Sequence, residues 1–308
     1  MKSYLKTTAA ALIAAFSCLA AAPSASAADL DLTQPRDALA AMRKINCSTI
    51  DAKPLVYHWS GNVWSRVEGE PDRLLFKVEG MNIRQCGAVQ DPVRGQGFRL
   101  VSRELMLYLD PVTGQRIDSW KNPWTGAEVS VAHVANDPVN QRPMFERDAQ
   151  GRPFVAPFRI QGDRVFMPAE IPLFYPNPMA GDYQDYVGNH YHAMEIFDFA
   201  ADRRTLVSSR TDTADAVLSW VRIAPWMPFM KMGSRPGLMV FNAMSQPVDG
   251  IEALPQVLRD AIATDYPAYA APPPLDDARP NATSWTVARA GIDAERRANP
   301  QPARQSGH

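Results

Sequence analysis

Two matching turn sequences, twelve residues apart, constrain the fold of this chain most strongly. Residues 110–114 read DPVTG and residues 122–126 read NPWTG, so both follow the pattern [Asp/Asn]-Pro-x-Thr-Gly. Proline presets φ for a turn and glycine supplies the left-handed position, so each segment predicts a hairpin turn. One strand, 115–121, then lies between the two turns. The spacing therefore predicts an antiparallel meander.

Further segments rich in β-forming residues flank these turns. They cover residues 55–66, 73–84, 98–109, 128–134, 153–160, 164–174, 191–200 and 216–229. None of the connections between them has the amphipathic helix that would join parallel strands. Consecutive antiparallel strands must hide their edges, and closure is the usual solution. We therefore predict a mainly β fold, in which the meander closes into a lipocalin-like barrel or a strongly bent double sheet.

Apolar residues at helical spacing predict short flanking helices at 35–45 and 250–264. We assign residues 28–270 to a single β-barrel-like domain. The proline-rich stretch that follows, 271–308, predicts an extended C-terminal tail, which we expect to be the least ordered part of the mature chain.

The first 27 residues have the parts of a secretory signal peptide. Lys2 and Lys6 precede an apolar stretch, and Ala25-Ser26-Ala27 supplies small residues for cleavage. The apolar stretch is shorter than the roughly 20 residues that a membrane-spanning helix needs. We therefore predict an exported protein, periplasmic or secreted, without a membrane span.

Cysteine usage agrees with export but leaves the redox state open. Cleavage would remove Cys18 and leave Cys47 and Cys86. An even number of cysteines in an oxidising compartment favours a disulfide. The alternative is two separate buried thiols.

Charge and motifs exclude several functional classes. The net charge is −1 and no basic cluster is present, so we predict no nucleic-acid partner. The chain has no Gly-x-Ser-x-Gly, Gly-x-Gly-x-x-Gly, P-loop, His-Glu-x-x-His or Cys-x-x-Cys motif, which argues against the enzyme classes that depend on them. With 7 Trp, 9 Tyr and 12 Phe, the composition favours a pocket for a small hydrophobic molecule. The sequence does not indicate an oligomeric state.

Three separated blocks carry a family resemblance. They are YHWSGNVW in the first β segment, NPWTGAEVSVAHVANDPVN at 122–140, and YHAMEIFDFAAD at 191–202. Together they resemble the bacterial and fungal family catalogued as domain of unknown function 1838, over about residues 35 to 270. The resemblance implies no agreed reaction, cofactor or catalytic residue.

The segment GNHYHAMEIFDF at 188–199 places two histidines one residue apart. On a strand, His190 and His192 would share one face about 7 Å apart, whereas Glu195 would point to the other face. His58 and His133 lie in other β segments and could join them. We therefore predict that these four histidines surround the polar end of an interior cavity and are the catalytic candidates.

Histidines that titrate near neutral pH suit metal-free acid/base chemistry of the isomerase, lyase or cyclase type. We predict that the residues binding the substrate are Tyr57, Trp59, Trp64, Arg103, Tyr108 and Asp137. No cofactor is predicted. The alternatives are a non-enzymatic protein that binds a ligand or an envelope partner, a metal site with histidine ligands, and histidines that serve only structural hydrogen bonding.

Overall fold

A computed structural model describes residues 28–183 and 190–299, so the predicted signal peptide lies outside the described residues. The strands are β1 (Leu55–Arg66), β2 (Arg73–Asp91), β3 (Gly95–Leu109), β4 (Ser119–Lys121), β5 (Glu128–Ser130), β6 (Val134–Asn136), β7 (Met144–Phe145), β8 (Arg159–Gln161), β9 (Arg164–Pro176), β10 (His190–Asp202), β11 (Ala216–Ala224) and β12 (Leu238–Val248). The α-helices are α1 (Pro35–Asn46), α2 (Arg203–Val207), α3 (Gln256–Thr264) and α4 (Ser284–Ala298). Short 3₁₀ helices are η1 (Pro228–Met230), η2 (Ile251–Ala253) and η3 (Pro267–Ala270).

Ten strands form one antiparallel sheet, which confirms a mainly β, antiparallel fold. Its order is β6-β3-β2-β1-β12-β11-β10-β9-β8, with β7 also paired to β3. The sheet consists of two meanders, one from the N-terminal half and one from the C-terminal half, joined where β1 pairs with β12. In the described part of the chain, no strand pairing joins β8 to β6, so a closed barrel is not found.

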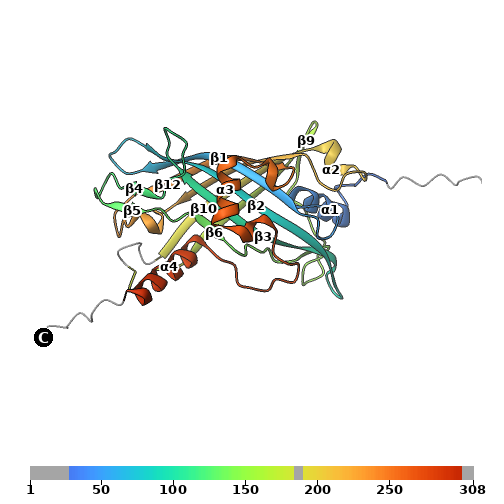
Figure 1. Cartoon of the computed structure of the whole chain (residues 1–308). Coiled ribbons are helices and arrows are strands. Elements are labelled where there is room, and N and C mark those ends of the chain that lie inside the picture. The colour runs from blue at the N-terminus through green and yellow to red at the C-terminus, as the bar shows by residue number, and fades with distance from the viewer. Residues whose placement is uncertain (1–27, 184–189, 300–308) are drawn as a thin grey trace, which may run out of the picture.

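The sheet is nonetheless strongly curved. Tyr57 on β1 and Phe199 on β10 are three strands apart, which would separate them by roughly 14 Å in a flat sheet. Their ring centroids are only 6.5 Å apart. Figure 1 shows the long strands wrapped around a common interior. The sheet therefore has a concave face, which holds the interior, and an outer face.

Alternation along the strands sorts the side chains between these two faces. On the outer face, α3 packs Leu258 onto Met81 of β2 and Leu105 of β3, and Figure 1 shows this helix lying across the sheet. The concave face carries three apolar clusters. One includes Tyr57 and lies against α1, a second includes Phe76 and lies against η1, and a third includes Tyr191 and lies against Trp285 of α4.

Several predicted elements are confirmed and others differ. The first helix and the strand 55–66 match α1 and β1. The strand predicted at 115–121 is ordered as a strand only at Ser119–Lys121, where it pairs with β5 in a separate two-stranded sheet. The helix predicted to begin at residue 250 is α3, which begins only at Gln256. The residues before it form η2, and Pro255 directly precedes the first turn of α3.

The C-terminal tail is not extended throughout, contrary to the prediction. Residues Ser284–Ala298 form α4, whose start is capped by Thr283 and whose Trp285 is 1% exposed. The stretch before α4 is held on the sheet, since Gln85 donates to the Pro273 carbonyl and the Ala282 amide donates to the Pro138 carbonyl. An apolar anchor and regular hydrogen bonds therefore outweigh the high proline content.

Cys47 and Cys86 form a disulfide, which ties the end of α1 to β2. Closing a loop of this length contributes on the order of 4 kcal/mol in the chain-entropy model. No helix in the described ranges is long and apolar enough to span a membrane.

Candidate functional site

The histidine pair of β10 lies on the outer face of the sheet. His190 and His192 are both exposed, and their rings pack 5.4 Å and 5.3 Å from the ring of Phe174 on β9. Between them, Tyr191 is fully buried on the concave face. Because side chains alternate, a strand that buries Tyr191 must turn both histidines outward. The prediction that they line an interior cavity is wrong.

The other two histidines do not join this pair. His58 also faces outward, where its Nε2 lies 2.6 Å from a carboxylate oxygen of Glu79. The side chain of His133, which directly precedes β6, is buried, and its Nδ1 accepts a 3.1 Å hydrogen bond from the Tyr108 amide. Burial, and then the nearby Arg116, lower the pKa of His133 to about 4, so this ring is neutral at physiological pH. The four histidines therefore do not form one site.

The predicted substrate-binding residues divide between the two faces. Arg103 lies on the outer face, 3.0 Å from Asp137, and donates to the carbonyls of Ala268 and Ala271. Arg103 and Asp137 therefore hold the C-terminal segment rather than a ligand in the interior. Trp64 faces outward as well and is 37% exposed.

Tyr57, Trp59 and Tyr108 do face the interior, where they are buried on the concave side. Trp59 packs against Trp220 of β11, with ring centroids 6.5 Å apart. Tyr108 packs against Phe76 at 5.1 Å. These rings give the interior aromatic walls.

Next to these apolar clusters, the concave face carries a group of polar residues that we call the interior polar cluster. It consists of Arg84 on β2, Glu104 and Tyr108 on β3, Asn136 on β6, Tyr191 and Glu195 on β10, and Arg222 on β11. Strand register places them on one face, since Glu104 is opposite Asn136 and Glu195 is opposite Arg222. Sequence reasoning missed all of them except Tyr108.

Arg222 is the centre of the contacts on the β10–β11 side of the cluster. Its Nη2 donates to the hydroxyl of Tyr191, and its Nη1 lies 3.5 Å from a carboxylate oxygen of Glu195. Burial alone would lower its pKa, but Tyr191 and Glu195 raise it, so the guanidinium remains charged.

Glu104 has the most perturbed environment among the carboxylates of the cluster. Burial raises its pKa, and the negative charge of Glu195 raises it further, although Asn136 and two arginines oppose this shift. The interaction between Glu104 and Glu195 spans the interior from β3 to β10. A carboxyl group in this setting keeps its proton to a higher pH than an exposed glutamic acid does, which is the direction of shift that suits a proton donor.

Six buried polar atoms on the concave face have no hydrogen-bond partner among the described residues. They are Trp59 Nε1, Tyr108 Oη, Asn136 Oδ1, Trp220 Nε1, Arg222 Nε and Ser245 Oγ. Buried polar atoms in native proteins are nearly always paired with protein or with ordered water or ligand. Their gathering on a single face distinguishes this interior from an ordinary core.

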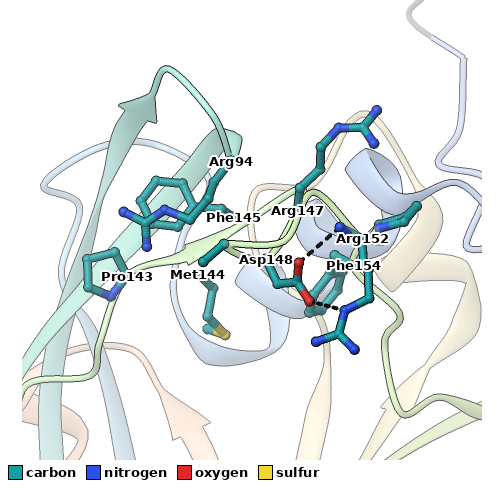
Figure 2. Close-up of a pocket in the computed structure, with 10 residues that line it drawn as sticks. Arg94, Pro143, Met144, Phe145, Arg147, Asp148, Arg152 and Phe154 are labelled. Atoms are coloured by element: carbon teal, nitrogen blue, oxygen red, sulfur yellow. Dashed lines mark hydrogen bonds and ion pairs between the residues drawn. The ribbon is translucent and has the colours of Figure 1, made fainter.

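One hollow on the molecular surface lies away from this interior. It has a volume of about 340 Å³ and is open to solvent, beside β7 and the β2–β3 hairpin (Figure 2). Arg94 covers the ring of Phe145 at 3.9 Å, and Arg152 is paired with Asp148. The lining shares no residue with the interior polar cluster, and its charged groups are largely paired.

No group of three or more His, Cys, Asp or Glu side chains within residues 28–183 and 190–299 is arranged to hold a metal ion.

Comparison with known proteins gives one match. The family model described as "Protein of unknown function (DUF1838)" matches residues 52–291, which agrees with the resemblance seen in the sequence and extends into α4. No curated protein and no solved structure matches the chain.

Proposed function

As this chain belongs to the family described as protein of unknown function (DUF1838), we propose that its function lies in the interior polar cluster. The concave face binds a small, largely apolar organic molecule, and Glu104 exchanges a proton with it. The reaction type is metal-free acid/base chemistry, such as an isomerisation, elimination or cyclisation.

One observation carries this proposal: a carboxyl group with a raised pKa, Glu104, faces a second carboxyl group and a charged arginine inside aromatic walls. Pairs of titratable groups whose environments separate their pKa values are typical of acid/base sites. In the proposal, Glu104 donates the proton, Arg222 and the Tyr191 hydroxyl hold an oxygen of the molecule, and Glu195 keeps Arg222 oriented.

An exported location fits this proposal. The Cys47–Cys86 disulfide is typical of proteins that work in an oxidising compartment, and the sequence of residues 1–27 has the pattern of a secretory signal. We therefore propose that the protein acts in the periplasm or outside the cell.

The test begins with the molecule that the protein carries. Native mass spectrometry of the purified protein, followed by solvent extraction, identifies a co-purified ligand. The recovered ligand is then incubated with protein in D₂O, and deuterium incorporation is followed by NMR. We expect wild-type protein to accelerate exchange or conversion, and Glu104→Gln to bind the ligand without doing so.

Glu79→Gln is the matched control, because it makes the same change on the outer face, beside His58. It should behave like wild-type protein. If Glu104→Gln retains full turnover, the assignment of Glu104 is wrong. If neither protein changes the bound ligand, the chain is a binding protein without acid/base activity.

A further inference from the structure

The two arginines of the interior polar cluster differ in how completely they are paired. Arg84 donates from Nε to Asn82 at 2.7 Å and lies over the ring of Tyr57 at 4.8 Å. In Arg222, by contrast, Nε has no partner among the described residues, and Nη1 is 3.5 Å from Glu195, longer than a good charge-assisted hydrogen bond. Arg222 therefore has donor capacity that the protein itself does not use.

The other unpaired atoms are also mostly donors. The indole N–H groups of Trp59 and Trp220 can only donate, and the hydroxyls of Tyr108 and Ser245 can donate or accept. Asn136 Oδ1 alone is restricted to accepting. A ligand that fits this set presents oxygen acceptors, whereas a cationic ligand would leave the N–H groups unpaired.

The charges of the interior polar cluster also favour a ligand that is not a cation. Arg84 and Arg222 are balanced by Glu104 and Glu195 only when both carboxyl groups are ionised. Burial and the charge of Glu195 raise the pKa of Glu104. Whenever Glu104 is protonated, these four groups together carry one net positive charge, which a single anionic group would neutralise.

We propose that the interior site selects an acidic ligand: a small aromatic or alicyclic molecule with one carboxylate, which is held by Arg222 with its ring against the aromatic wall that Trp59 and Trp220 form together. This inference rests on the proposed function, since it names the class of molecule bound at the same site. The walls suit a ring, because Trp220 also packs against Phe241, with centroids 5.7 Å apart. Guanidinium and carboxylate form short, charge-assisted hydrogen bonds, and aromatic walls exclude the water that would weaken them.

Two probes of the same shape test the preference. 2-Naphthoate carries the carboxylate, and 2-naphthamide replaces it with a neutral amide of nearly equal size. Dissociation constants are measured with the full-length mature protein by isothermal titration calorimetry, and quenching of tryptophan fluorescence gives a second readout from the interior walls. We expect 2-naphthoate to bind roughly 10- to 100-fold more tightly than 2-naphthamide.

The variants assign the preference to Arg222. Because removing one partner would leave a buried charge unpaired, the pair is replaced together as Arg222→Gln with Glu195→Gln. This double variant should bind both probes equally. Tyr191→Phe, which removes the hydroxyl that contacts Arg222, should weaken 2-naphthoate several-fold and leave 2-naphthamide unchanged. Arg66→Gln changes an exposed arginine of β1 and should keep the wild-type preference.

The outcomes separate the inference from the proposed function. If 2-naphthamide binds as tightly as 2-naphthoate, the interior binds small molecules but has no preference for acids, and the inference is overturned. If neither probe binds and no ligand is co-purified, the proposed function itself fails. A preference that survives in the double variant places the carboxylate away from Arg222 and also overturns the inference.

Discussion

Gly80 on β2 allows the Trp59 indole to lie directly against the neighbouring strand. A Cβ at this position would be 2.2 Å from Cε2 and 2.3 Å from Nε1 of Trp59, so the indole must move in a Gly80→Ala variant. The ring has little room, since it is 9% exposed and packs on Trp220. Overpacking of this kind costs about 1 to 3 kcal/mol, and the reduced freedom of the unfolded chain offsets roughly 0.5 kcal/mol of it. The expected loss is therefore about 0.5 to 2.5 kcal/mol.

Thermal denaturation followed by circular dichroism measures this loss, which corresponds to a decrease in Tm of roughly 1 to 10 °C for a chain of this size. Gly291→Ala is the control, because nothing lies within 4 Å of a Cβ at that helical position, and this variant should be slightly more stable than wild type. In a Trp59→Phe background, the smaller ring should reduce the cost of Gly80→Ala. An equal cost in both backgrounds would show that the clash with the indole is not the cause.

Three further predictions concern the two faces of β10 and the interior. Replacing His190 and His192 together by alanine should change the free energy of unfolding by less than about 1 kcal/mol and leave 2-naphthoate binding intact, because both side chains are exposed. A loss of 2-naphthoate binding in the titration would contradict their outward placement. Because folding raises the pKa of Glu104, the native state binds more protons than the unfolded chain. Wild type should therefore lose stability relative to Glu104→Gln as the pH rises above 4.5, the ordinary pKa of a glutamic acid. Urea denaturation at several pH values measures the difference in stability between the two proteins, and a difference that does not change with pH would refute the shift. Trp285→Ala should cost about 3 to 5 kcal/mol, because this buried ring packs 5.0 Å from Tyr191; a loss below about 1 kcal/mol in the same assay would show that α4 does not stabilise the domain.

The antiparallel fold could be predicted from local patterns in the sequence. β1 matches its prediction residue for residue, because alternating aromatic residues and nearby turns report directly on the backbone. Strand β12 was missed because its inward positions include Ala243 and Ser245, which resemble neither a strand nor a helix when read alone. It is nevertheless the strand that joins the two meanders. Pairing between the first and last strands is a long-range contact, which no local pattern specifies.

The candidate site was harder to predict from the sequence. Alternation along a strand identifies which residues share a face of the sheet, but not which face points to the interior. The sequence correctly separated Glu195 from His190 and His192. The histidines nevertheless lie outside, because the burial of Tyr191 turns the side chains of its own parity, including the carboxylate of Glu195, toward the interior. Glu104 and Arg222 interrupt alternate positions of β3 and β11 that are otherwise mostly apolar, and an inward ionisable residue of this kind is a signal that can be sought in a sequence.

The position of the interior polar cluster helps to decide whether the cluster stabilises the fold or binds a ligand. Apolar side chains fill the concave face on both sides of it, and α3 and the disulfide stabilise the sheet from outside the cluster. Buried ionic groups are weak stabilisers, and well-packed apolar residues of similar volume often do as well or better. A cluster that existed only to join strands would therefore be expected to satisfy its own hydrogen bonds. Here Tyr108, Asn136 and Arg222 keep buried, unpaired atoms on the same face of the sheet, so the arrangement favours recognition of a molecule over support of the sheet.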